Sequence, residues 1–177
     1  MHPVHDIEVP PDIEAFVPAL IEIPRGSHLK YEVDKPTGLL RLDRVLYSAV
    51  HYPANYGFIP RTHADDGDPL DILVLMQEPV EPLAIVRARP LGGLRMVDKG
   101  GDDKILAVCI DDPAYAHYES VQALPPHIAR ELDRFFRDYK LLEGKAVDFE
   151  VGDMYGRDRA LEVIRAARAA YDRGEGR

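Results

Sequence analysis

Four carboxylates lie within seven residues of this sequence, in the segment Asp65-Asp66-Gly67-Asp68-Pro69-Leu70-Asp71. The apolar run of residues 72–76 follows at once and predicts a buried strand, which would anchor the acidic loop to the core. Carboxylates held close together repel one another, so a fold that gathers them needs protons or cations. Without histidine or cysteine beside them they suit a hard cation, Mg²⁺ before Zn²⁺. An ordinary solvated Asp-Gly turn that leads into a strand is the alternative interpretation.

A second acidic group, Asp98, Asp102 and Asp103, directly precedes Lys104, where we expect a strand to begin. If this turn faces the first acidic loop, the two segments together could bind cations. The alternative is a charged hairpin tip built around its two glycines.

Basic and tyrosine side chains recur near the expected ends of strands and helices: Lys30, Arg44, Tyr52, Tyr56, Tyr139 and Lys140. A phosphate ligand needs such groups, because lysine supplies a point charge, arginine a bidentate fork and tyrosine a hydroxyl donor. Any one of them alone is equally explained as a surface ion-pair partner or as part of an aromatic core.

Several other functional classes lack their motifs. The sequence has no His-x-x-x-His or cysteine pair for zinc, no nucleophile elbow, no P-loop and no EF-hand spacing. Its formal charge of −9, from 22 basic and 31 acidic residues, argues against a nucleic-acid or anionic-membrane surface. The single cysteine, Cys109, excludes an internal disulfide. With no signal pattern and no apolar run of membrane-spanning length, we expect a cytoplasmic protein.

The hydrophobic pattern predicts many short strands followed by two helices. Strands are expected at residues 20–23, 29–33, 39–44, 72–76, 83–89, 94–97, 104–110 and 147–151, with residues 52–58 as an aromatic, turn-rich stretch. Pro90 is expected to end one strand. One amphipathic helix has its apolar face from Ile128 to Tyr139, with Gly144 as its cap, and another covers residues 157–172. We expect a single domain, residues 1–177, that begins with an irregular arm, residues 1–18. The pattern favours a mainly β fold, a small barrel with flanking α-helices outside it.

Residues 66–72, Asp-Gly-Asp-Pro-Leu-Asp-Ile, resemble the signature of the soluble inorganic pyrophosphatases of family I, bacterial type. Further segments resemble that family in the same order, between about Ala19 and Gly144: residues 21–24, 30–34, 42–44, 52–59 and 135–140. The resemblance implies an OB-like five-stranded closed barrel with two C-terminal amphipathic helices. It also implies Mg²⁺-dependent hydrolysis of pyrophosphate to two orthophosphates without a covalent intermediate. From the resemblance we also expect several Mg²⁺ ions per active site, for which Mn²⁺ or Zn²⁺ could substitute. We further expect the chain to assemble as a homohexamer.

The resemblance also implies a role for each matching residue. Asp68 would accept the proton of the attacking water, and the metal ligands would be Asp66, Asp71, Asp98 and Asp102. The substrate would be bound by Lys30, Arg44, Tyr56, Tyr139 and Lys140, supported by Glu22, Glu32, Tyr52 and Lys104.

The second acidic segment departs from the family pattern by being one residue short. We fix its register from Lys104, because slippage at a strand start would turn side chains to the wrong face. Asp102 is then the metal ligand and Asp103 its outward neighbour. The position of the family's glutamate is either held by Lys99 or deleted, so we expect a weakened peripheral metal site near Asp98 unless Lys99 points away to solvent.

Two other functions remain open from the residues alone. One is a metal-dependent phosphohydrolase that acts on a nucleotide or another organic diphosphate. The other is a non-catalytic barrel that binds cations or acidic ligands without turnover. Phosphate release from pyrophosphate and from ATP, with and without Mg²⁺, distinguishes the three.

Overall fold

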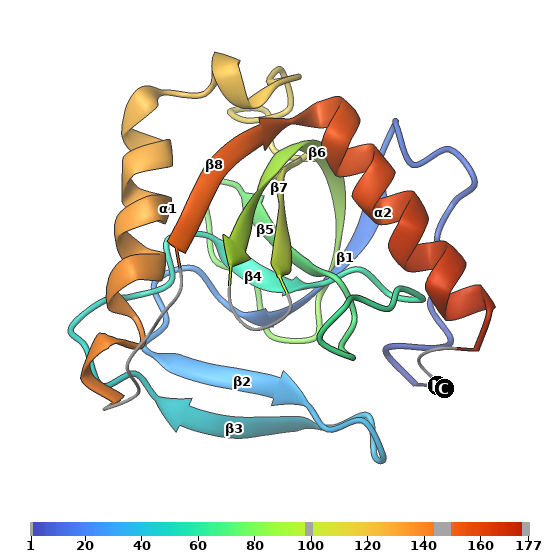
Figure 1. Cartoon of the computed structure of the whole chain (residues 1–177), viewed down its shortest axis with the longest axis horizontal. Helices are drawn as coiled ribbons and strands as arrows, with labels where there is room; N and C mark the ends of the chain where they lie inside the picture. The colour runs from blue at the N-terminus through green and yellow to red at the C-terminus, as the bar shows by residue number, and fades with distance from the viewer. Residues whose placement is uncertain (1, 98–100, 144–149, 175–177) are drawn as a thin grey trace.

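Five strands close into a ring in the computed structural model, which describes residues 2–97, 101–143 and 150–174 (Figure 1). The ring follows the order β1 (Val17–Ile23), β4 (Asn55–Phe58), β5 (Asp71–Leu75), β7 (Asp102–Cys109) and β6 (Ile85–Val97), and β6 pairs back onto β1. All pairs are antiparallel except β5 with β7. A sixth strand, β8 (Glu150–Gly156), joins β6 from outside the ring. This arrangement confirms the mainly β, OB-like fold.

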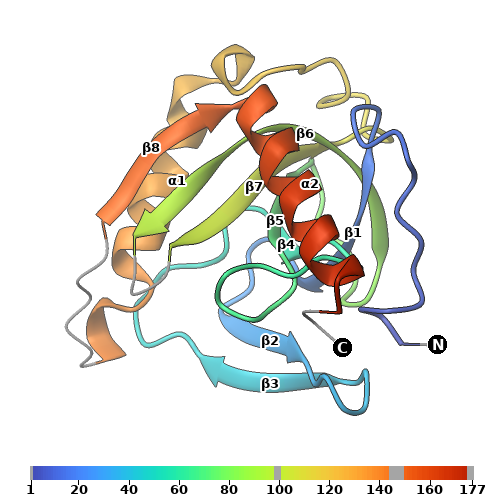
Figure 2. The same ribbon diagram turned by 45° about the vertical axis from the view of Figure 1, so that its right-hand side comes forward.

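The remaining elements surround the ring. A separate two-stranded sheet, β2 (Leu29–Val33) and β3 (Leu40–Val45), lies across one end of it (Figures 1 and 2). Helix α1 (Pro126–Asp138) and helix α2 (Arg157–Asp172) flank it on two sides, and short 3₁₀ turns cover Val121–Ala123 and Leu141–Glu143. No helix in the described part of the chain has the length and apolar character needed to cross a bilayer.

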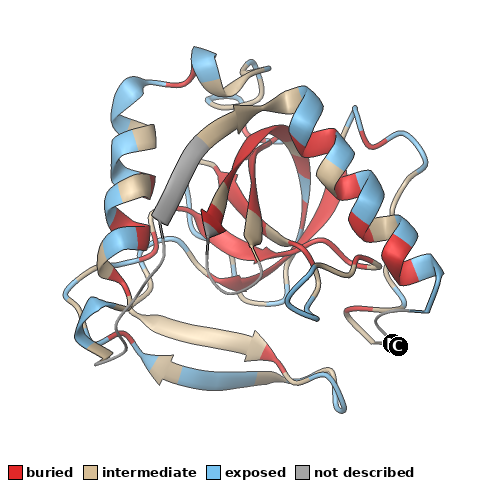
Figure 3. Cartoon of the chain, in the orientation of Figure 1, coloured by how far each residue is buried: buried red, intermediate tan, exposed pale blue. Residues whose placement is uncertain are grey.

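Most residues of the ring strands are buried (Figure 3), although the first half of β6 exposes Ile85 and Arg87 on one face. Along β5, Ile72 and Val74 join one apolar cluster with α2, whereas Leu73 and Leu75 join a second cluster with α1. Successive strand side chains point to opposite faces, so a strand covered on both sides reads as a continuous apolar run. The ring is therefore a firm base for the polar side chains at its strand ends.

Several boundaries differ from the sequence-based expectations. The strands expected at 83–89 and 94–97 are one strand, β6, because a shift in register between Pro90 and Gly92 accommodates the proline that we expected to end it. The turn-rich stretch contains a strand, β4, in which Gly57 packs against β1 so closely that a Cβ atom would lie 1.8 Å from the Leu20 carbonyl oxygen.

The other differences are shifts of a few residues. The first strand begins at Val17 and so takes two residues from the expected arm, and β7 begins at Asp102 rather than at Lys104. The last strand was expected at 147–151 and is described from Glu150 to Gly156. Helix α2 has the expected limits, while Gly144 lies outside the described residues. The division into one domain stays a prediction.

Candidate active site

A cavity of about 610 Å³ lies between the ring, the β2–β3 sheet and the acidic loop of residues 65–70. Among the predicted site residues that the structure describes, all line it except Tyr52. Asp98 and Lys99 lie outside the described residues, so the weakened peripheral site stays a prediction. The cavity thus brings together side chains from β1, β2, β3, β4, β5, β7 and the end of α1.

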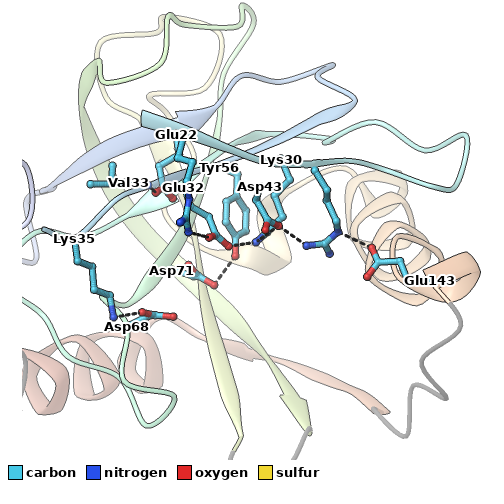
Figure 4. A network of polar contacts seen from close by, with 12 residues as sticks. Glu22, Lys30, Glu32, Val33, Lys35, Asp43, Tyr56, Asp68, Asp71 and Glu143 are labelled. Carbon is cyan, nitrogen blue, oxygen red and sulfur yellow. Dashed lines mark hydrogen bonds and ion pairs between the residues drawn. The ribbon is translucent and has the colours of Figure 1, made fainter. Parts of the chain in front are cut away.

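On the ring side of the cavity, a group of polar side chains from three neighbouring strands forms what we call the ring wall: Tyr56, Asp71, Asp102 and Lys104. The Lys104 ammonium is almost fully buried and lies 2.6 Å from an Asp71 oxygen and 2.8 Å from an Asp102 oxygen. The pairing of β5 with β7 sets Lys104 directly opposite Asp71. The Tyr56 hydroxyl donates to Asp71 (Figure 4). It also accepts from the Lys104 ammonium at 3.1 Å.

The electrostatics of the ring wall follow from this pairing. Burial alone would lower the pKa of Lys104, but the carboxylates of Asp71 and Asp102 outweigh it and raise that pKa. Burial raises the pKa of Asp102, and the charge of Asp71 adds to the rise against the opposing effect of Lys104. The wall therefore holds two carboxylates around one buried cation.

Glu22 on β1 is buried beside the ring wall and links it to the β2–β3 sheet. One carboxyl oxygen accepts the backbone N–H of Val33 at 2.6 Å (Figure 4). Burial raises the pKa of Glu22 to about 8, with the Val33 hydrogen bond opposing the rise and the charge of Asp71 adding to it. A cation bound nearby would favour the ionised form of this carboxyl.

Opposite the ring wall, the β2–β3 sheet and the 3₁₀ turn at Leu141–Glu143 present paired charges, which we call the outer rim: Lys30, Glu32, Asp43, Arg44 and Glu143. Lys30 and Arg44 face each other across the two strands. The Lys30 ammonium contacts Glu32 and lies 3.2 Å from Asp43, while the Arg44 Nε donates to Glu143 at 2.7 Å (Figure 4). Lys30 and Arg44 therefore line the cavity, and each is held in place by at least one carboxylate.

The acidic loop carries Asp66 and Asp68 at the mouth of the cavity. Asp68 is exposed and forms an ion pair with Lys35, whose ammonium also donates to the Gly67 carbonyl at 3.0 Å (Figure 4). The Asp68 N–H donates to an Asp66 oxygen at 3.0 Å, and Gly67 has a φ of +89°, which favours glycine. The loop thus has a defined shape before any ligand binds.

The end of α1 supplies the two remaining predicted residues, Tyr139 and Lys140. Tyr139 packs against Phe135 and Phe136, and the Lys140 ammonium lies 5.2 Å from the centre of the Tyr139 ring. Tyr52, which we expected at the site, lies behind it, with its ring 5.4 Å from the ring of Tyr56. Tyr52 therefore supports Tyr56 through packing and does not line the cavity.

The two neighbouring aspartates of β7 point to opposite faces. Asp102 lines the cavity, whereas Asp103 lies toward a second cavity and accepts hydrogen bonds from Arg95 and Tyr155. This is the alternation that a strand imposes on successive residues. The structure places Asp102 beside Asp71 in the register that we fixed from Lys104, while its role as a metal ligand stays a prediction.

Sequence reasoning did not assign roles to some residues on the cavity: Asp34, Lys35, Arg41 and Glu143. Asp34 lies within a segment that resembles the family, and Lys35 follows it directly. No sequence pattern around Glu143 pointed to the site. Glu143 reaches Arg44 because the chain after α1 packs against β3.

The donor atoms of the cavity are suited to a hard cation. Glu22, Asp66, Asp71 and Asp102 offer only carboxylate oxygens, which Mg²⁺ prefers. Within the described ranges, no three histidine, cysteine, aspartate or glutamate side chains are already gathered tightly enough to hold a metal. The Lys104 ammonium lies between Asp71 and Asp102, and the raised pKa of Asp102 and of Glu22 indicates acidic groups that an added cation would stabilise in their ionised form.

Known proteins are similar to this chain in both sequence and fold. The inorganic pyrophosphatase family model matches residues 19–172. Soluble inorganic pyrophosphatases of Oryza sativa subsp. indica and of Chlamydomonas reinhardtii are each 51% identical to this chain over 171 residues, which is 96% of the chain. The matched part covers 79% of the Oryza protein and 88% of the Chlamydomonas protein. The inorganic pyrophosphatase structure from Thermus thermophilus has a TM-score of 0.90 and 42% identity, covering 96% of this chain and 98% of that one. The one from Helicobacter pylori has a TM-score of 0.88 and 38% identity, covering 94% and 99%. The chain belongs to the inorganic pyrophosphatase family, the enzymes that hydrolyse pyrophosphate.

Proposed function

We propose that this chain hydrolyses pyrophosphate in the cavity by Mg²⁺-dependent attack of a water molecule, without a covalent intermediate. The observation that carries the proposal is that one cavity has partly buried carboxylates on its ring wall and cations on the outer rim opposite. Oxygen-only donors suit the metal, and the cations suit a phosphate ligand.

The metal ligands in this proposal are Asp66, Asp71 and Asp102, together with Asp98. Bound Mg²⁺ neutralises charge on the substrate and lowers the pKa of a water molecule. Lys104 and the Tyr56 hydroxyl keep Asp71 oriented toward the cavity, because both contact the same carboxylate oxygen. Mn²⁺ or Zn²⁺ would act as substitutes to the extent that these oxygen ligands accept them.

Asp68 accepts the proton of the attacking water in this proposal. Its carboxylate is exposed at the mouth of the cavity, and its partner Lys35 is equally exposed, so the ion pair between them is weak. The carboxylate is therefore free to exchange its partner for a water molecule. Asp66 fixes the backbone N–H of Asp68 and thereby the direction of the side chain.

The phosphate oxygens are bound by Lys30, Arg44, Tyr56, Tyr139 and Lys140. Glu32, Asp43 and Glu143 hold the first two of these cations in the free protein. Pyrophosphate carries more negative charge than a single carboxylate, so it competes well for the same donors. The rim cations then stabilise negative charge that develops on the departing phosphate.

The proposal extends to assembly and location. We propose a homohexamer, which is supported by exposed apolar side chains on β3 and beside it: Leu39, Leu42, Val45 and Tyr47. A monomer in light scattering at working concentration would contradict this. The net charge of −9 supports the absence of nucleic-acid and membrane partners, and a cytoplasmic location stays a prediction.

The test measures phosphate release from pyrophosphate and from ATP by the whole chain. Protein freed of metal by a chelator should be inactive and recover with added Mg²⁺, and pyrophosphate should be strongly preferred over ATP. Ca²⁺ should inhibit, because it is larger and accepts irregular coordination that misplaces the water. Full activity in excess chelator would overturn the metal mechanism. Preference for ATP would favour a nucleotide phosphohydrolase, and no turnover of either substrate would favour a binding protein.

A further inference from the structure

A second cavity, of about 470 Å³, lies on the other side of the acidic segments, against α2. Asp65, Arg95, Gly101 and Asp103 are among its lining residues. Asp65 directly precedes Asp66 in the chain, and Asp103 lies between Asp102 and Lys104. Asp65 and Asp103 are therefore each the chain neighbour of a residue that lines the first cavity.

Arg95 connects these two acidic residues. It lies directly across from Asp103 in the pairing of β6 with β7, and its guanidinium NH1 lies 3.0 Å from an Asp103 oxygen. Its NH2 lies 3.9 Å from an Asp65 oxygen. The guanidinium thus joins the start of β7 to the acidic loop, two segments that are more than thirty residues apart in the sequence.

The surrounding residues hold Arg95 and Asp103 in this arrangement. The Tyr155 hydroxyl donates to the second Asp103 oxygen at 3.1 Å, so both oxygens of this carboxylate have donors. Gly101 has a φ of +74°, and a Cβ atom there would lie 2.2 Å from the Arg95 NH2. The guanidinium therefore rests against the glycine backbone at a place that no other residue type leaves open.

The position of Arg95 has a consequence for the cavity on the other face. The two acidic segments repel each other, and the cost is highest when no cation lies between them. A positive charge behind them offsets part of that repulsion while leaving Asp66 and Asp102 free to face the first cavity. The Asp103 side chain is 13% exposed and that of Arg95 is 41% exposed, so their contact is screened less than a pair that is exposed on both sides.

We propose that Arg95 is a positioning residue, which through Asp103 and Asp65 holds the two acidic segments at the separation that metal binding requires. The inference rests on the proposed function, because it assigns Arg95 to the same Mg²⁺ site. Arg95 itself contacts neither the metal nor the substrate. Residues that orient ligands in this indirect way typically change metal affinity by about 10-fold to 100-fold when they are removed.

The test is a calorimetric Mg²⁺ titration of the whole, metal-freed protein, with Arg95→Ala compared to wild type. The dissociation constant for Mg²⁺ should rise by about 10-fold, at the low end of that range because Arg95 acts through neighbours of the ligands. At saturating Mg²⁺, kcat should stay within about 3-fold of wild type, since the ligands themselves are intact. Arg95→Lys keeps the charge without the planar fork and should restore part of the affinity.

Arg87→Ala is the matched control. Arg87 lies on the same strand, β6, and pairs with Asp111 just beyond the end of β7, but far along the strand from the acidic segments. Its ion pair is exposed on both sides, so Mg²⁺ affinity should change by less than about 2-fold. An equal loss of affinity in both variants would overturn the proposal, because any cation on β6 would then have the same effect.

A double-mutant cycle separates positioning from direct ligation. If Asp103 acts through Arg95, then Asp103→Asn and Arg95→Ala should each weaken Mg²⁺ binding, and the double variant should bind no more weakly than the weaker of the two single variants. Losses that add would make Asp103 a metal ligand itself and overturn the proposal. If Arg95→Ala fails to fold, Tyr155→Phe, which removes only the hydroxyl on Asp103, carries the same prediction with a smaller loss.

The outcome distinguishes this inference from the proposed function. Wild-type protein that binds Mg²⁺ and hydrolyses pyrophosphate, together with Arg95→Ala that binds Mg²⁺ with unchanged affinity, would overturn only the role of Arg95. Wild-type protein that binds no Mg²⁺ would overturn the proposed function and this inference with it.

Discussion

The two sides of the cavity hold their charges in different ways. On the ring wall, Lys104 is 3% exposed and lies between two carboxylates on strands that are paired with each other. At the mouth, Lys35 and Asp68 are 56% and 58% exposed and come from two separate turns. The strength of an ion pair depends on burial, so the wall is costly to break and the mouth is easily rearranged. This difference suits a site whose wall stays fixed while the side chains at its mouth exchange partners.

Removing the buried cation should have the largest effect on stability. Lys104→Met leaves Asp71 and Asp102, whose side chains are only partly buried, without their shared partner, and we expect a loss of about 1–3 kcal/mol in the free energy of unfolding in chelator. Added Mg²⁺ should recover more stability in this variant than in wild type, because a metal can replace the missing charge. Denaturant unfolding with and without Mg²⁺ measures both effects.

Lys35→Met is the matched control at the mouth of the cavity. The same change in an exposed pair should cost less than about 1 kcal/mol, with little dependence on Mg²⁺. Similar losses in the two variants would contradict the distinction between the wall and the mouth.

The buried carboxyl beside the wall should make stability depend on pH. The pKa of Glu22 is raised from 4.5 to about 8 in the folded protein, so folding takes up a proton between these values. Without metal, the free energy of unfolding should therefore fall as pH rises from about 4.5 to about 8, by at most ~1.4 kcal/mol per pH unit from this group. Glu22→Gln removes the titration. Equal slopes for the variant and wild type in chelator would show that Glu22 is already ionised.

The smallest effect is expected from Tyr52, which packs behind the site. Tyr52→Phe keeps the ring against Tyr56 and Phe135, so turnover should stay within about 3-fold of wild type. Tyr56→Phe removes the hydroxyl that contacts both Asp71 and Lys104, and it should lower turnover by about 10-fold or more. Pyrophosphate hydrolysis by the two variants, measured side by side, shows whether the tyrosine that lines the cavity matters more for turnover than the one that packs behind it. A larger loss for Tyr52→Phe would mean that Tyr52 acts directly.

The sequence predicts this fold best where one periodicity runs without interruption. Helix α2 has the expected limits because its apolar face repeats through Leu161, Ile164 and Tyr171 with no breaker. The strand at 55–58 was missed because its asparagine and glycine read as turn residues, although Gly57 is required by close packing against β1. Local signals report what a residue favours, and tertiary packing overrides them at such places.

The same limit applies to the candidate site. The acidic segments and the basic and tyrosine motifs were visible because each forms a compact pattern along the chain. Glu143 and Arg95 were not assigned, because their contacts join segments that only the closed ring brings together. Asp102 and Asp103 are adjacent in sequence yet face different cavities, so assigning either of them to the site depends on the strand register.

The most direct test of the account is the turnover of pyrophosphate by Asp68→Asn, measured together with its Mg²⁺ affinity. Asparagine keeps the shape of the side chain and removes the base, so turnover should fall on the order of 10²-fold or more while Mg²⁺ binding largely persists. Asp111→Asn, at a similarly exposed aspartate outside the cavity, is the control and should retain wild-type turnover. A near-wild-type rate in Asp68→Asn would contradict the account, because another group would then have to activate the water.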